Sequence, residues 1–158
     1  MPRCKRPKAA PSTRAYRRRI RQLGIHRFDL DRRGLARVLG ELEARIMEAV
    51  WEGDGPTVRE ICDALGPDDH YKTVMTVTNR LVEKGFLVRQ RTVVRAYVYR
   101  APMDREAFLT QAAASVASGL VGEFGRNALA QLVRAADELD PTYLDELERL
   151  VRERKGDR

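Results

Sequence analysis

The spacing of apolar residues changes at Gly85, and this change constrains the fold more than any other feature of the sequence. Lys84 and Gly85 suit a helix end, because a cation complements the helix dipole and glycine readily adopts the left-handed conformation. After Gly85 the period falls to two in residues 86–91 and 95–100, which predicts a β-hairpin. Before it, the apolar residues lie at the spacing of one helical face: Val74, Val77, Leu81 and Val82.

Two more helices are predicted ahead of the helix 71–85. Thr57 and Glu60 have the spacing of a capping box, so a helix starts there and runs to about Leu65. An earlier helix begins near Leu39 and ends at the breaker segment 53–56, with this apolar stripe: Leu42, Ile46, Ala49 and Val50. Three helices followed by a hairpin are the plan of a winged helix-turn-helix, in which the third helix enters the DNA major groove.

The polar face of the helix 71–85 is the first candidate site. Its side chains are of middle length and carry donors, acceptors or methyl groups, as a helix that reads base edges requires. An ordinary solvated helix face is an equally open interpretation, although such a face usually carries more Glu and Lys. The candidate DNA-binding residues on this helix are Lys72, Thr73, Met75, Thr76, Asn79 and Arg80.

Three arginines in the predicted wing form the second candidate site. Arg89, Arg91 and Arg95 would project towards DNA phosphates. Equally, they could be a solvated edge that protects the sheet from aggregation. The tip, residues 92–94, lacks the Asn-Gly or Asp-Gly pair that favours a tight turn.

The positive charge of the chain is concentrated in its first segment. The 158 residues carry a net +7, of which residues 1–38 hold 13 Lys/Arg against 2 Asp/Glu, or +11, while residues 39–158 hold −4. The basic character therefore does not by itself indicate that the folded part binds nucleic acid. We expect residues 1–38 to be disordered, because they are Arg-rich, contain three prolines and lack an apolar period. They are either a basic arm on DNA or, as we prefer, a solvated tail or residues ahead of the true translation start.

Composition also argues against several classes of protein. Cys4 and Cys62 form neither a disulfide framework nor a metal cluster, which suits a reducing cytoplasm. His26 and His70 are far apart and no catalytic spacing occurs, so we expect no enzyme activity, no cofactor and no bound metal. No apolar run is long enough to span a membrane, and residues 1–38 lack the core of a secretory signal. The sequence thus predicts a cytoplasmic protein.

Residues 103–158 are predicted to be helical and to need a partner. Asp104 can cap one helix, and Asp140 with Pro141 can start the last one. Amphipathic helices of this length are too few to close a core alone, and a second copy of the chain is the simplest partner. The candidate dimerisation residues are Phe108, Leu120, Leu144, Leu147 and Val151.

Residues 39–154 resemble the penicillinase-repressor family (BlaI/MecI type). The matching segments are Leu42-Glu43, Ile46-Met47, Val50-Trp51, Val58-Arg59-Glu60-Ile61, Thr73-Val74-Met75-Thr76-Val77, Arg80-Leu81, Lys84-Gly85 and Tyr97-Val98-Tyr99. Such proteins are homodimeric repressors that bind a palindromic operator and are released when a membrane-bound sensor protease signals. The resemblance implies three partners: double-stranded DNA, a second copy and an upstream sensor protease. It also implies that Lys72, Thr73, Met75 and Thr76 contact DNA, with Arg80 nearer the backbone.

Two departures from the family bear on regulation. Founding members are cleaved at an Asn-Phe dipeptide, which is missing between Ala113 and Leu120, so release by the same proteolysis does not carry over. The copper-responsive branch ends in Cys-x-Cys pairs, whereas no cysteine follows Cys62, so copper sensing is not expected.

The sequence therefore predicts a mostly α protein with a small β-hairpin wing. We expect a basic extension over 1–38, a winged helix-turn-helix domain over 39–102 and a helical dimerisation region over 103–158. The expected function is sequence-specific transcriptional repression by a homodimer. The alternative is a winged-helix module that binds proteins and reads no DNA, whose helix face would tolerate charge reversal.

Overall fold

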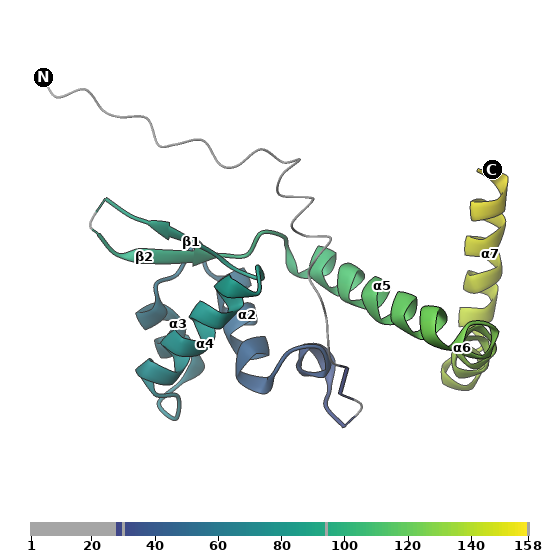
Figure 1. Ribbon diagram of the computed structural model, residues 1–158, viewed down its shortest axis with the longest axis horizontal. Coiled ribbons are helices and arrows are strands. Elements are labelled where there is room, and N and C mark those ends of the chain that lie inside the picture. Colours follow the sequence, from purple (N-terminus) through teal and green to yellow (C-terminus); the bar gives the residue numbers. More distant parts are fainter. Residues whose placement is uncertain (1–27, 30, 94, 158) are drawn as a thin grey trace, which may run out of the picture. The chain divides into compact units, whose positions relative to one another are not determined.

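The computed structural model describes residues 28–29, 31–93 and 95–157 and has two compact units, which divide after Ala112. The described part of the first unit contains η1 (Gly34–Arg37), α2 (Glu41–Glu52), α3 (Val58–Leu65), α4 (Tyr71–Glu83), β1 (Val88–Arg91), β2 (Tyr97–Arg100) and the start of α5 (Arg105–Phe124) (Figure 1). The second unit contains the rest of α5, α6 (Arg126–Leu139) and α7 (Thr142–Gly156). Helices α2, α3 and α4 followed by the hairpin confirm the winged helix-turn-helix.

The predicted helix boundaries follow from local chemistry. The capping box is formed: the Glu60 N–H donates to Thr57 Oγ1 at 3.3 Å, and the Thr57 N–H donates to Glu60 Oε2 at 2.7 Å. Gly85 follows α4 in the left-handed conformation at φ +79°, as expected. These two features fix the start of α3 and the end of α4.

The core of the first unit lies where α2, α3, α4 and the residues after α4 meet. Among the described residues, the one buried polar side chain is that of Thr78, which the apolar pattern did not include. It is fully buried on α4, whereas Val77 and Val82 are half-buried. Its hydroxyl donates to the Val74 carbonyl oxygen at 2.8 Å, so the buried donor is satisfied within the helix. The largest fully buried apolar side chains are Ile46, Met47, Ile61, Val74, Leu81 and Leu87.

The two strands are antiparallel and shorter than predicted. Val88 lies opposite Arg100 and Arg91 opposite Tyr97. Phe86 and Leu87 lie between α4 and β1, where their N–H groups both donate to the Leu81 carbonyl near the end of α4, at 2.9 and 3.2 Å. Both side chains are buried in the core, and this burial explains the apolar run that looked like the start of a strand.

A turn without Asn-Gly closes the hairpin. The Arg95 N–H donates to the Thr92 carbonyl at 3.1 Å, and the Thr92 N–H donates to the Ala96 carbonyl at 2.8 Å. Arg95 has φ +63°, the position where such a turn usually has glycine. This longer turn does not need the two-residue signal that the sequence lacks.

The start of α5 packs into the core of the first unit. Its cap is as predicted, with the Ala107 N–H donating to Asp104 Oδ1 at 2.8 Å. The ring centroid of Phe108 lies 5.4 Å from that of Trp51 and 5.5 Å from that of Phe86, both edge-on. Phe108 is only 3% exposed, so this candidate dimerisation residue is part of the core of its own chain. The other dimerisation candidates lie in the second unit.

Packed residues also occur ahead of Leu39. Leu35 and Ala36 in η1 are buried and belong to the same hydrophobic core as α2. The segment 34–38 therefore contributes to the fold, and the expected boundary at residue 39 falls inside packed structure.

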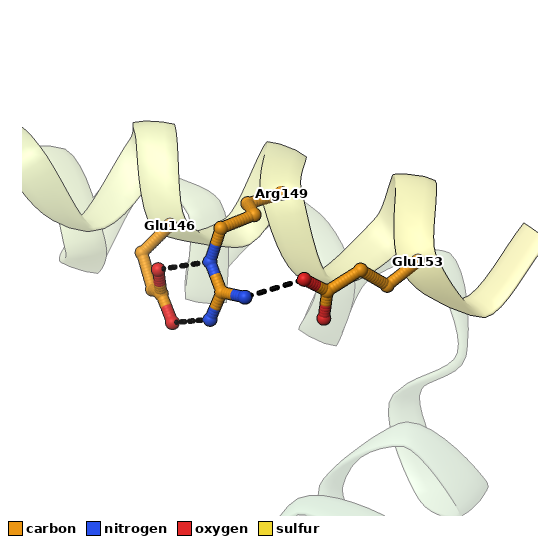
Figure 2. A network of polar contacts seen from close by, with 3 residues as sticks. All are labelled: Glu146, Arg149 and Glu153. Atoms are coloured by element: carbon orange, nitrogen blue, oxygen red, sulfur yellow. Dashed lines mark hydrogen bonds and ion pairs between the residues drawn. The ribbon is translucent and has the colours of Figure 1, made fainter.

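The second unit buries little apolar surface within the chain. Of its described residues, Ala128 alone is buried, whereas Phe124 is 59% and Leu139 79% exposed. Phe124 is the last residue of α5. Ion pairs along α7 hold its polar face, and in Figure 2 Arg149 bridges Glu146 and Glu153. No helix in the described part of the chain is long and apolar enough to cross a membrane.

Candidate nucleic-acid interface

Helix α4 presents the predicted polar face to solvent. Five of its six candidate residues are exposed, namely Lys72, Thr73, Met75, Thr76 and Arg80, and Asn79 is half-buried. The first turn of α4 contains no acid, so no carboxylate of that turn neutralises the positive end of the helix dipole. An anionic partner can therefore approach the start of α4 without repulsion from a carboxylate of that turn.

The Thr76 hydroxyl already has a partner. It donates to the Lys72 carbonyl oxygen at 2.9 Å, within the helix. Its lone pairs and its methyl group remain exposed, so in this rotamer Thr76 can accept a hydrogen bond or contact a methyl group.

Helix α2 holds α4 at both ends by ion pairs. At the start, Arg45 Nη2 lies 2.7 Å from Asp69 Oδ2 and donates to the Leu65 carbonyl at 2.7 Å. The Asp69 oxygen is buried and accepts no hydrogen bond from any described group, so this contact is electrostatic. At the other end, Lys84 Nζ lies 2.6 Å from Glu43 Oε1. These contacts fix α4 against the rest of the unit.

The Glu43 carboxylate is stabilised as an anion. Partial burial alone would raise its pKa, but the hydrogen bonds from Lys84 and from the Gly40 N–H, with the charges of Lys84 and Arg80, leave the pKa below its ordinary value. The ion pair at the end of α4 is therefore present at neutral pH.

The wing is anchored at its base. The Tyr99 N–H donates to the Pro56 carbonyl at 2.9 Å, and Arg100 Nη1 lies 2.7 Å from Asp54 Oδ1. Gly55 at φ +75° lies between these two contacts, and a Cβ there would come within 2.9 Å of the Arg100 guanidinium. The hairpin is thus tied to the loop between α2 and α3.

All three candidate arginines of the wing are exposed, but their surroundings differ. The Arg89 guanidinium lies over the ring of Tyr97, with its central carbon 4.6 Å from the ring centroid. Burial raises the pKa of the Tyr99 phenol, and the charge of Arg89 only partly offsets this effect.

A family model, penicillinase repressor, matches residues 39–153, from just after η1 into α7. The chain belongs to the penicillinase-repressor family. Members of this family are DNA-binding transcriptional repressors, and they are not enzymes. A search of curated proteins finds no match.

In this member of the family, the two predicted clusters lie in one unit. The six residues of α4 and the three wing arginines all lie between residues 72 and 95, on elements that share the core with α2. Sequence reasoning missed Tyr97 as a partner of Arg89. The alternation of the two strands could have placed both side chains on one face, but only the pairing register brings them together.

Proposed function

We propose that this repressor acts as a homodimer on a palindromic operator, with α4 reading bases in the major groove and the wing contacting backbone phosphates. The observation that carries the proposal is the exposed face of α4, which has no acid in its first turn and carries short polar, methyl-bearing and cationic side chains. A major groove offers acceptors, donors and thymine methyl groups to such side chains.

Individual roles follow from side-chain chemistry. Thr73 and Thr76 offer methyl groups and hydroxyl oxygens to base edges, and Asn79 offers an amide that matches adenine. Lys72 and Arg80 carry the charges that phosphates or guanine require. Met75 is 38% exposed and offers an apolar contact on the same helix.

Dimerisation is supported by the apolar surface that α5, α6 and α7 leave uncovered. Leu120 is 38%, Leu147 36% and Val151 49% exposed, and Leu144 is half-buried. A second copy would cover these side chains and join two reading helices, which matches a palindromic operator. An upstream membrane sensor protease is the proposed source of the releasing signal, although residues 113–120 lack the Asn-Phe pair.

Selection from a random DNA pool tests the function directly. The purified full chain should enrich duplexes that contain two inverted copies of one half-site. A variant with Thr73 and Thr76 both changed to Ala should lose this enrichment but still retain DNA non-specifically at low salt. If the wild-type chain enriches no sequence, the protein-interaction alternative replaces this function.

A further inference from the structure

Arg89 differs from the other wing arginines because its side chain is already held in place. Strand pairing sets Arg89 opposite Tyr99, and Tyr97 lies two residues along on the same face of the hairpin. The guanidinium stacks on the Tyr97 ring at 4.6 Å. In the described part of the chain, neither Arg91 nor Arg95 makes a side-chain ion pair or a ring contact.

The groups that hold Arg89 are uncharged. Other arginines of the first unit are held by carboxylates: Arg45 by Asp69, Arg100 by Asp54 and Arg105 by Glu48. Arg89 stacks instead on a phenol ring and has no carboxylate within ion-pair distance among the described residues. Its side chain is thus ordered while its positive charge stays available to an anion.

The held cation lies on the hairpin that the proposed function places against DNA phosphates. Arg89 and Tyr97 are both exposed, with Tyr97 44% accessible, so an incoming phosphate can reach the guanidinium.

We propose that Tyr97 is a positioning residue that holds Arg89 ready for a backbone phosphate of DNA. This inference rests on the proposed DNA-binding function and assigns different roles to the wing arginines. Arg89 is the preordered anchor, whereas Arg91 and Arg95 must become ordered when DNA binds. Ordering a long side chain on binding weakens affinity by roughly two- to tenfold, so releasing Arg89 from Tyr97 should cost that much.

A double-mutant cycle on the full chain tests this role. The probe is a labelled duplex of random sequence, because a phosphate contact needs no operator. Affinity is measured by fluorescence anisotropy over a series of salt concentrations. Tyr97→Leu should weaken binding roughly two- to tenfold with an unchanged salt slope, because the charge is retained. Tyr97→Phe keeps the ring and should bind like the wild type.

Combining Tyr97→Leu with single arginine variants identifies the arginine that Tyr97 positions. Arg89→Ala should weaken binding and lower the salt slope by about one unit. Adding Tyr97→Leu to Arg89→Ala should cause no further loss, whereas adding it to Arg91→Ala should cause its full loss. If Tyr97→Leu damaged the fold, it would instead weaken binding in the wild type, in Arg89→Ala and in Arg91→Ala alike.

Three results would overturn the proposal: wild-type affinity for Tyr97→Leu, a loss for Tyr97→Phe equal to that for Tyr97→Leu, or a loss that persists in Arg89→Ala. The second would mean that the phenol hydroxyl itself contacts DNA. Failure of the proposed function gives a separate result, since the wild-type chain would then bind no duplex even at low salt.

Discussion

Thr76 and Arg91 represent two kinds of contact, base reading and phosphate binding. The exposed methyl group and oxygen of Thr76 can distinguish bases, and a wrong contact of this kind costs about 1–3 kcal/mol. We expect Thr76→Ala to weaken operator binding by that amount and to leave binding to scrambled duplex nearly unchanged. Arg91→Ala should weaken binding to both and reduce the slope of log K against log salt by about one unit.

A salt titration of both variants on both duplexes is the measurement. If Thr76→Ala lost equal affinity for operator and for scrambled DNA, α4 would not read bases. The existing hydrogen bond from Thr76 to Lys72 sharpens the expectation, because the lost interaction should be an accepted hydrogen bond or a methyl contact.

The backbone of Arg95 at the wing tip is strained. A side chain at φ +63° costs about 1–2 kcal/mol, and glycine avoids most of this cost. Arg95→Gly and Arg95→Ala both remove the cation, so their difference isolates the backbone. We expect the glycine variant to have the larger free energy of unfolding, by up to about 1 kcal/mol, in urea denaturation. An alanine variant of equal or greater stability would contradict the strain.

Several residues show why sequence predicted elements better than side-chain roles. The spacing of Val74 and Leu81 placed the buried face of α4, and both side chains are fully buried. Thr78 lies on this face too, four residues after Val74, but a pattern of apolar side chains does not include a threonine whose hydroxyl is satisfied by the Val74 carbonyl. Phe108 looked like a dimer contact because a helical pattern does not tell which apolar partner a residue meets. In the structure, the apolar partners of Phe108 are Trp51 and Phe86, which are distant from it in sequence.

At the scale of elements, the ion pair between α2 and the end of α4 gives the fold a pH dependence. The pKa of Glu43 is lower in the folded chain, so its contribution to stability is full above the unfolded pKa. That contribution is lost as pH falls from about 4.5, the ordinary value, through the folded pKa. Glu43→Gln should therefore flatten the decrease in unfolding free energy on acidification.

Thermal unfolding of the wild type and Glu43→Gln across this acidic range measures the effect. Lys84→Met removes the partner and should flatten the same range, since burial without Lys84 no longer lowers the Glu43 pKa as far. Parallel pH profiles for all three proteins would exclude the ion pair as a source of acid sensitivity.

The η1 segment extends the packed domain beyond the region that the family model matches. Leu35 is 6% exposed and packs in the core that includes α2. Leu35→Ala should lower the free energy of unfolding by about 2–4 kcal/mol, because it leaves a cavity. Arg33→Ala, an exposed neighbour, is the matched control and should change stability by less than about 0.5 kcal/mol. If urea denaturation shows a loss of unfolding free energy for Leu35→Ala as small as that for Arg33→Ala, η1 does not stabilise the fold.

At the scale of the whole molecule, we expect the second unit to be needed for dimerisation and the first unit to fold without it. A chain that ends at Ala112 keeps Phe108 over Trp51 and Phe86, so its winged helix should stay folded. We expect this chain to be monomeric in analytical ultracentrifugation and the full chain to be dimeric. Its affinity for a full palindrome should fall steeply, because two half-site contacts are no longer linked. A dimeric Ala112 chain would place the interface in the winged helix.

The exposed apolar surface of α6 and α7 has a consequence for gene dosage. If these helices become stable only when two chains meet, active repressor forms in a second-order reaction. Halving the amount of chain in a cell well below the dissociation constant then leaves about a quarter of the active form. Repression would switch over a narrower range of expression than a monomer allows, and unpaired chains would be the ones that proteases remove first.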